Sequence, residues 1–207
     1  MNRNREWLVP LTGVAFVVVG IISFIIAGEP KSADEPVNEV VDFYLDNKDS
    51  VQIGSVAGVL AGLLLIFFAA HLRSVLRAAG GAGEALSLVS FLGLALVALG
   101  FAIDGTIAFA LAEAADDIDP IAVQALQALW DNDFLPIMLG VVAFLWATGI
   151  SVLRSRALPR WIGWVMLLLG IVAFTPIGFV SFVGTAILVV IISILLSLRA
   201  RSTPSPA

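Results

Sequence analysis

Long uncharged apolar runs are the feature that most constrains how this chain folds. Residues 8–27 and 134–153 carry no charged side chain over 20 positions each, and residues 161–198 carry none over 38. A helix needs about 20 apolar residues to cross a hydrocarbon core about 30 Å thick. Hydrophobic residues make up 60% of the chain and charged residues 13%, against about 45–50% and about 25% in soluble domains. The sequence therefore predicts an all-α, polytopic membrane protein.

We expect six transmembrane helices in three parallel-oriented hairpins, forming a single domain over residues 1–198. The predicted spans cover residues 8–27, 51–72, 86–111, 134–153, 161–175 and 178–198. The last two divide one uncharged run at the turn Thr175-Pro176-Ile177-Gly178. The first run is longer than the apolar part of a signal peptide, about 7–15 residues, and is interpreted as a retained anchor. Residues 199–207, rich in Ser and Pro, are predicted to be a disordered tail.

Two amphipathic segments lie between the spans of the first two hairpins. In residues 36–47 apolar side chains recur at helical spacing, with acidic and amide side chains largely opposite them. Residues 120–131 begin at Asp119-Pro120, a helix-start signal, and carry Gln124 and Gln127 as a thin polar stripe. Both segments are predicted to be short helices that cap the extracytoplasmic side. Asp131 or Asp133 is expected to cap the fourth span.

The charged residues are unevenly distributed between the connections. Nine of the eleven basic residues fall on the side that holds both termini: Arg3, Arg5, Arg73, Arg77, Arg154, Arg156, Arg160, Arg199 and Arg201. The opposite side holds only Lys31 and Lys48, together with seven acidic residues in 28–50 and six in 113–133. The positive-inside rule then places both termini in the cytoplasm of a multi-pass plasma-membrane protein. The acidic outer side is interpreted as a solvated surface that attracts cations, and not as a metal site.

The fifth predicted span is too short to cross a bilayer. At about 1.5 Å per residue, residues 161–175 cover about 22 Å, less than the core of about 30 Å. The turn after it is then expected to stop below the outer surface. We predict a recess that opens toward the outer leaflet, covered by the apolar faces of the two amphipathic helices.

Asp104 is the charged residue inside the third span, and two interpretations of it stay open. If the span is centred on the bilayer, the carboxylate lies in the outer half of the hydrocarbon. There it costs about 2.5–3.5 kcal/mol on insertion scales and marks a candidate ligand or proton site. Alternatively, the span ends at Ile103, and Asp104-Gly105 breaks the helix at the outer interface.

Other polar residues in the outer half are candidates to line the recess with Asp104. They are Ser23, Gln52, Ser55, Thr106, Thr175, Ser181 and Thr185. The same residue types also serve as hydrogen-bond partners between membrane helices, which is the alternative interpretation. Gly54, Gly58 and Gly62 share one helix face at four-residue spacing and are predicted to allow close helix packing within the chain.

The sequence argues against several classes of chemistry. It contains no cysteine and one histidine, His71, which excludes thiolate sites and bis-histidine ligation. No nucleotide loop, nucleophile elbow or His-Glu-x-x-His motif occurs. We therefore expect no cofactor, no catalytic residue and no metal ligand.

One short motif supports a family resemblance. The stretch Leu158-Pro159-Arg160-Trp161-Ile162-Gly163-Trp164 is similar to a Leu-Pro-Arg-Trp-Leu-Gly-Trp motif that opens a late helix in small multi-span actinobacterial membrane proteins with no assigned activity. The resemblance extends over most of the chain through the six-span pattern. It implies a topology and no substrate, cofactor or site residue.

These observations lead to two functional hypotheses. In the first, the protein acts without catalysis and binds a lipid or apolar small molecule in the recess, or serves as an accessory of a membrane complex. The alternative is a small proton-coupled transporter that uses Asp104. The expected partners are membrane lipids, an apolar small molecule, and a second copy or another membrane protein; nucleic acid is not among them.

Overall fold

The computed structural model describes residues 3–80 and 83–202, and over these residues it is all-helical. A 3-10 helix, η1 (Arg3–Leu11), leads into the first α-helix. The α-helices are α1 (Thr12–Ala27), α2 (Val37–Asp46), α3 (Lys48–Ala78), α4 (Gly83–Ala114), α5 (Pro120–Trp130), α6 (Leu135–Ser155), α7 (Arg160–Val172) and α8 (Phe179–Ser202). The all-α class predicted from the apolar runs is confirmed.

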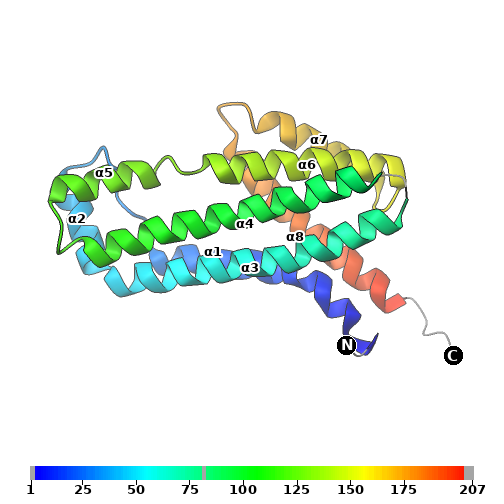
Figure 1. Ribbon diagram of the computed structural model, residues 1–207, viewed down its shortest axis with the longest axis horizontal. Coiled ribbons are helices and arrows are strands. Elements are labelled where there is room, and N and C mark those ends of the chain that lie inside the picture. The colour runs from blue at the N-terminus through cyan, green and yellow to red at the C-terminus, as the bar shows by residue number, and fades with distance from the viewer. Residues whose placement is uncertain (1–2, 81–82, 203–207) are drawn as a thin grey trace.

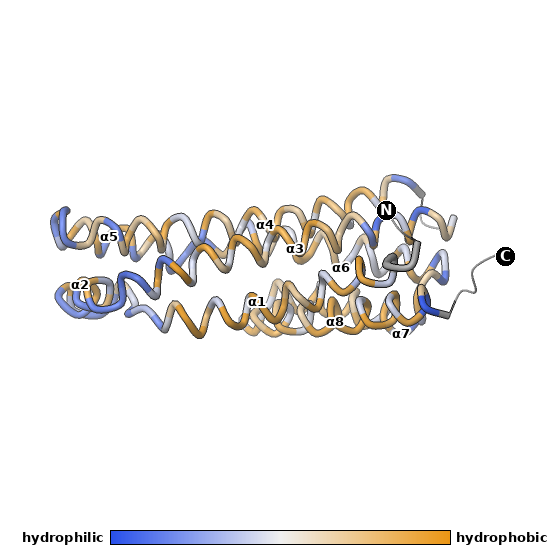
Figure 2. Tube along the Cα trace, turned by 90° about the horizontal axis from the view of Figure 1, so that it is seen from below, coloured by the Kyte–Doolittle hydropathy of each residue, from blue (hydrophilic) through white to orange (hydrophobic). Residues whose placement is uncertain are grey.

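The long helices lie side by side in an elongated bundle (Figure 1). Viewed from below, α3 and α4 lie in one layer, and α1, α7 and α8 lie in a second (Figure 2). Around the bundle each helix contacts the next in the order α1, α3, α4, α6, α7 and α8, and α8 returns to α1. The short helices α2 and α5 lie together at one end, and α1 begins and α8 ends toward the other (Figure 1).

Helix length and hydropathy show a multi-pass membrane protein. Within the described residues, five helical segments are long and apolar enough to cross a bilayer: Trp7–Ala27, Lys48–Ala78, Glu84–Ala114, Pro120–Ser155 and Phe179–Arg201. The remaining apolar helix, α7, has 13 residues, and covers about 20 Å. Helix α7 ends at Val172, before the Thr175 expected from the sequence. The structure thus holds five long apolar segments and one short apolar helix.

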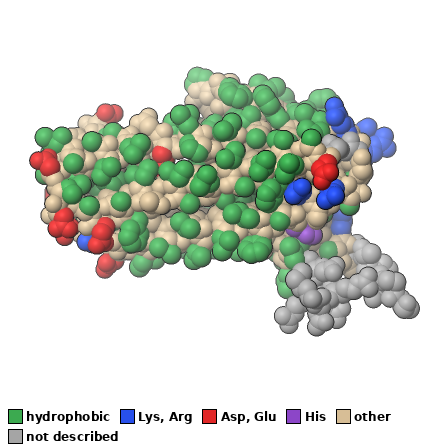
Figure 3. Space-filling view, in the orientation of Figure 1, with side chains coloured by type: hydrophobic (Ala, Val, Ile, Leu, Met, Phe, Trp, Pro, Cys, Tyr) green, Lys and Arg blue, Asp and Glu red, His purple; other side chains and the backbone are tan. Residues whose placement is uncertain are grey.

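The charges separate along the long axis of the bundle. On the face shown in Figure 3, acidic side chains gather over the end formed by α2 and α5, and basic side chains gather over the opposite end. Glu84 is an acidic residue at the basic end, where its carboxylate lies 3.6 Å from Arg77 Nη2. Between the two ends the surface is mainly apolar, as expected for a surface in contact with lipid.

The two short helices cap α3 and α4 at the acidic end of the bundle, which we call the outer end, and they do not cover a recess. Helices α3 and α4 contain 31 and 32 residues, about 46 and 48 Å of helix, so they extend beyond a core of about 30 Å. A separate apolar cluster joins these protruding ends to α2 and α5; its buried members are Val40, Tyr44, Val51, Ala108, Leu111, Ala112, Ala115 and Val123. The apolar faces of the cap helices are therefore already occupied.

A chain of polar contacts holds this cap together. Tyr44 and Gln127, both fully buried, are joined by a 2.5 Å hydrogen bond from the Tyr44 hydroxyl to the Gln127 side-chain oxygen. The Gln127 amide donates to Asp131, which also accepts from the backbone N–H of Ala33 at 2.9 Å. Burial, with the negative charges of Asp131 and Asp104, raises the pKa of the Tyr44 hydroxyl, which stays a neutral donor. The network fastens the first outer loop to α5.

The glycine face of α3 makes close contacts within the chain. A Cβ atom built on Gly54 would lie 2.7 Å from the Ala27 Cβ and 2.9 Å from the Ser23 carbonyl oxygen, both on α1. One built on Gly58 would lie 3.2 Å from the Ser23 hydroxyl, and one on Gly62 would lie 3.1 Å from the carbonyl oxygen of Ala98 on α4. Small residues here let α1 and α4 pack against α3 at short distance.

We predict that Gly54→Ala destabilises the protein and that Gly20→Ala does not. An added methyl at Gly54 meets the α1 backbone, and overpacking of this kind typically costs about 1–3 kcal/mol. A methyl at Gly20 meets nothing within 4 Å, and alanine is the better helix former. Thermal unfolding of both variants in the same detergent measures the difference. Equal melting temperatures for the two variants would contradict tight packing at the α1–α3 contact.

Candidate functional site

A cavity of about 820 Å³ lies where the short third pair of helices leaves the outer half of the bundle uncovered. The turn between α7 and α8 stands part-way along the bundle, far from the end that α2 and α5 occupy (Figure 1). The cavity is bounded by this turn, by α8, by the first half of α6, by Phe24 of α1, and by Phe101 and Asp104 of α4. We call it the outer recess. No residue of α2 or α5 lines the recess. The prediction that these two helices cover the recess is therefore wrong, because they pack on α3 and α4 instead.

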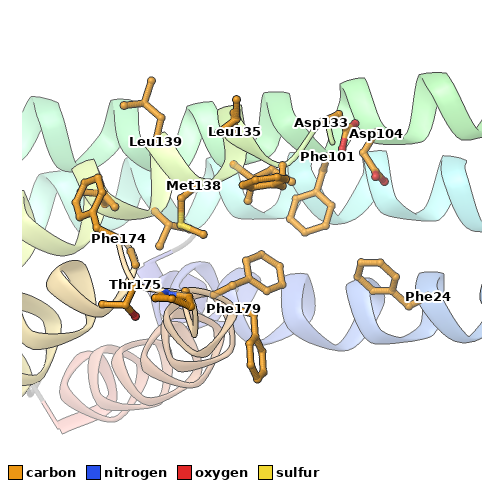
Figure 4. A pocket seen from close by; sticks show the side chains of 18 residues that line it. Phe24, Phe101, Asp104, Asp133, Leu135, Met138, Leu139, Phe174, Thr175 and Phe179 are labelled. Carbon is orange, nitrogen blue, oxygen red and sulfur yellow. The ribbon is translucent and has the colours of Figure 1, made fainter. Parts of the chain in front are cut away.

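The lining of the outer recess is apolar with one charged end. Two carboxylates, Asp104 and Asp133, lie together at one end, with the rings of Phe24 and Phe101 beside them (Figure 4). The other end is formed by the α7–α8 turn. Among the lining residues none is Lys, Arg or His. The recess therefore combines hydrocarbon walls with uncompensated negative charge.

Asp104 lies inside an unbroken helix. Helix α4 continues from Gly83 to Ala114, so the expectation that Asp104-Gly105 breaks the helix is wrong. Gly105 has a packing role, since a Cβ built on it would lie 3.1 Å from the carbonyl oxygen of Ser55 on α3. This close approach lets the Asp-Gly pair remain helical and holds the Asp104 carboxylate, half-buried, among apolar side chains.

Asp133 lines the recess, although its place in the sequence predicted a helix cap and not a site residue. Its expected role as a cap of the fourth span is wrong, because α6 begins at Leu135 behind the N-cap Phe134 and receives no side-chain cap. The Oδ2 atom of Asp133 is buried and has no hydrogen-bond partner in the described part of the chain. The sequence does hold a second aspartate, Asp131, two residues before Asp133. Asp131 accepts the hydrogen bonds from Gln127 and from the backbone N–H of Ala33.

A second cavity of about 460 Å³ shares three lining residues with the outer recess. These residues are Phe24, Phe101 and Asp104. The second cavity continues between α1, α3 and α4, and Trp130 of α5 borders it. Asp104 thus lines both cavities.

Of the other polar residues predicted to line the recess, Thr175 alone does so, and Ser55 and Ser23 border the second cavity. The hydroxyl of Thr175 donates to the Val172 carbonyl at 2.7 Å, and that of Ser55 donates to the Val51 carbonyl at 2.8 Å. Both hydroxyls are therefore engaged by their own helix or turn.

The rest of that set has structural contacts elsewhere. Ser181 is buried and donates to the Leu169 carbonyl at 2.6 Å, which ties α8 to α7. Thr106 and Thr185 donate to carbonyls one turn earlier in their own helices. Gln52 donates to Glu113 at 2.5 Å on the exposed outer side. The contacts of Ser181 and Gln52 join two helices, whereas those of Thr106 and Thr185 stay within one helix.

The carboxylate pair limits what the site can do chemically. No group of three or more His, Cys, Asp or Glu side chains arranged to hold a metal ion occurs among the described residues. Two carboxylates in apolar surroundings hold a proton or a cation, while the apolar walls hold hydrocarbon. These are properties of a binding site or of a proton-coupled path.

Fold and site together define a multi-pass, all-helical membrane protein with an apolar recess in its outer half. The chain belongs to the DUF4386 family, a domain of unknown function that matches residues 11–200. Comparison with curated proteins finds no match, and comparison with solved structures finds none. The family match covers nearly the whole helical domain and indicates no activity.

We predict that Asp104→Asn stabilises the protein. The substitution keeps the size of the side chain, removes a charge from apolar surroundings, and relieves the repulsion from Asp133. A gain of about 1 kcal/mol corresponds to roughly 2–4 °C in melting temperature for a chain of this size. Asp117→Asn, at an exposed loop position, is the control and should leave the melting temperature unchanged. A lower melting temperature for Asp104→Asn would mean that the carboxylate is a structural contact.

Proposed function

We propose that this protein binds a lipid or other apolar small molecule, without catalysis, in the outer recess. The observation that carries the proposal is the recess itself: about 820 Å³ of apolar-lined space in a single chain. Ligand sites typically enclose about 300–1,000 Å³ and combine apolar walls with a few polar groups. The apolar walls favour hydrocarbon as the occupant.

The rim of the recess supports entry from the lipid. Leu135 and Leu139 on α6 are 65% and 63% exposed, and Phe174 and Phe179 at the α7–α8 turn are 71% and 70% exposed. Apolar side chains this exposed are stable in contact with lipid tails and costly in water. A ligand that moves within the outer leaflet would pass between these two sets of residues.

For the topology we propose six membrane segments with both termini in the cytoplasm. Helix α7 and the oblique helix α8 would form a third, shallow hairpin whose turn stops inside the bilayer (Figure 1). Support comes from the separation of basic and acidic ends in Figure 3 and from the positive-inside rule. A bacterial plasma membrane is the expected location.

A role as an accessory of a membrane complex, or assembly with a second copy, belongs to the same proposal. It draws support only from the apolar outer surface, which suits helix contacts as well as lipid. The binding measurement below bears on it, because an adduct that is a protein subunit would appear as its own mass.

A small proton-coupled transporter is the second candidate. It is favoured by one observation, the presence of Asp104 in the lining of both cavities. In many transporters, a carboxylate that faces two cavities in turn carries the proton. Proton flux into sealed vesicles under an imposed pH gradient separates this candidate from passive binding.

Native mass spectrometry of the protein extracted with its own lipids tests the binding proposal. We expect a stoichiometric adduct that persists at activation energies which strip bulk lipid. Met138→Trp, which places a larger ring in the recess, should lose the adduct. Leu99→Trp, at a position on α4 that is 53% exposed and outside the recess lining, should keep it. A clean wild-type mass, or an adduct unaffected by Met138→Trp, would reject the recess as the binding site.

Cysteine labelling in intact cells tests the topology, since the chain has no cysteine of its own. We expect a membrane-impermeant maleimide to modify Asp117→Cys and to leave Arg154→Cys unmodified until the cells are opened. Both positions are exposed. Labelling of Arg154→Cys in intact cells would reverse the proposed orientation.

A further inference from the structure

We propose that the outer recess selects an amphiphile with an ammonium head group, held between Asp104 and Asp133, with its hydrocarbon part along α6. The inference rests on the proposed binding function and names the class of ligand. Its first support is the charge of the site. Two carboxylates share one end of the recess, and no Lys, Arg or His lines it.

No basic side chain lines the recess beside these carboxylates, and the neighbouring indole N–H of Trp130 is a neutral donor. Lys48, a basic residue of the outer side, lies 3.9 Å from Glu113 and 3.8 Å from Asp116. Asp133 Oδ2 is buried without a hydrogen-bond partner among the described residues. A buried charge that lacks a partner is strongly unfavourable, and a cationic donor that arrives with the ligand would remove that cost.

The aromatic rings next to the carboxylates favour the same head group. Phe24 of α1 and Phe101 of α4 stand beside Asp104 in Figure 4 and line both cavities. The face of an aromatic ring attracts a cation within about 6 Å of its centre. An ammonium group at this end would meet two carboxylates and two rings, whereas a phosphate or a carboxylate head would meet like charge.

The remaining walls suit a hydrocarbon chain. Along α6 the lining continues through Met138, Val141 and Val142, and on α8 it includes Phe182. From Leu135 to Val142 this wall is about 12 Å long at the helical rise per residue. The acidic outer end of the molecule would also raise the local concentration of cations near the recess.

The experiment compares three probes with one hydrocarbon chain: dodecylamine, dodecanol and dodecanoate. Binding is measured to the full chain in phosphatidylcholine nanodiscs, with empty nanodiscs subtracted to remove partition into lipid. We expect dodecylamine to bind at least about 10-fold more tightly than dodecanol, the order of one charge-assisted contact. Dodecanoate should bind most weakly.

Two charge variants locate the preference. In Asp104→Asn/Asp133→Asn, the ratio of dodecylamine to dodecanol affinity should fall to near one. Asp42→Asn/Asp117→Asn removes the same charge from exposed positions outside the recess lining and should keep the wild-type ratio. A cooperative thermal unfolding transition of each variant in the same nanodiscs shows that it is folded.

The outcomes separate the ligand class from the binding function. If dodecylamine and dodecanol bind equally to the wild type and Met138→Trp abolishes both, the recess binds ligands but the ammonium inference is overturned. If the exposed-position variant loses the preference as well, long-range surface charge explains it, and the inference is again overturned. If no probe binds saturably, the proposed binding function fails first.

Discussion

Mismatch between helix length and bilayer thickness is the constraint on which the rest of this structure depends. Helices α3 and α4 are longer than a hydrocarbon core, and α7 is shorter than one. The long pair extends into water and must bury its apolar ends, so α2 and α5 pack there. Because α7 is short, the α7–α8 turn stops part-way along the bundle, and the outer recess lies between that turn, α6 and Asp104 of α4.

Close helix approach keeps this uneven bundle together. In lipid, apolar side chains gain little from contact with one another compared with lipid tails, so packing distance and polar contacts matter more. Gly54 and Gly62 bring α1 and α4 close to α3. On the outer side, the buried Tyr44 and Gln127 pair performs a similar role through a hydrogen bond, because both ends of that bond would be costly to leave unpaired.

The carboxylates of the recess work against stability, and in the proposed function they select the ligand. Asp104 is maintained in an apolar wall at a free-energy cost, and Asp133 adds a second negative charge at the same place. A ligand or a proton that neutralises these carboxylates would bind more strongly, because its binding removes part of the free-energy cost of holding negative charge in apolar surroundings.

The sequence by itself determined most of the helices. Apolar runs near 20 residues predict α1, α3, α4 and α6, and the periodicity of residues 36–47 predicts α2, because local spacing of apolar residues is what decides a helix and its buried face. The short fifth run also predicted a recess in the outer half. The tertiary structure decided what surrounds it. Contacts between residues about 60–100 positions apart, such as Tyr44 with Gln127, decide which helices α2 and α5 pack on. Such contacts also decide whether Asp133 caps a helix or faces a cavity. Local patterns do not encode those contacts: an aspartate before an apolar run has the same sequence signature whether its carboxylate meets a helix end or, as Asp133 does, an apolar space beside Asp104.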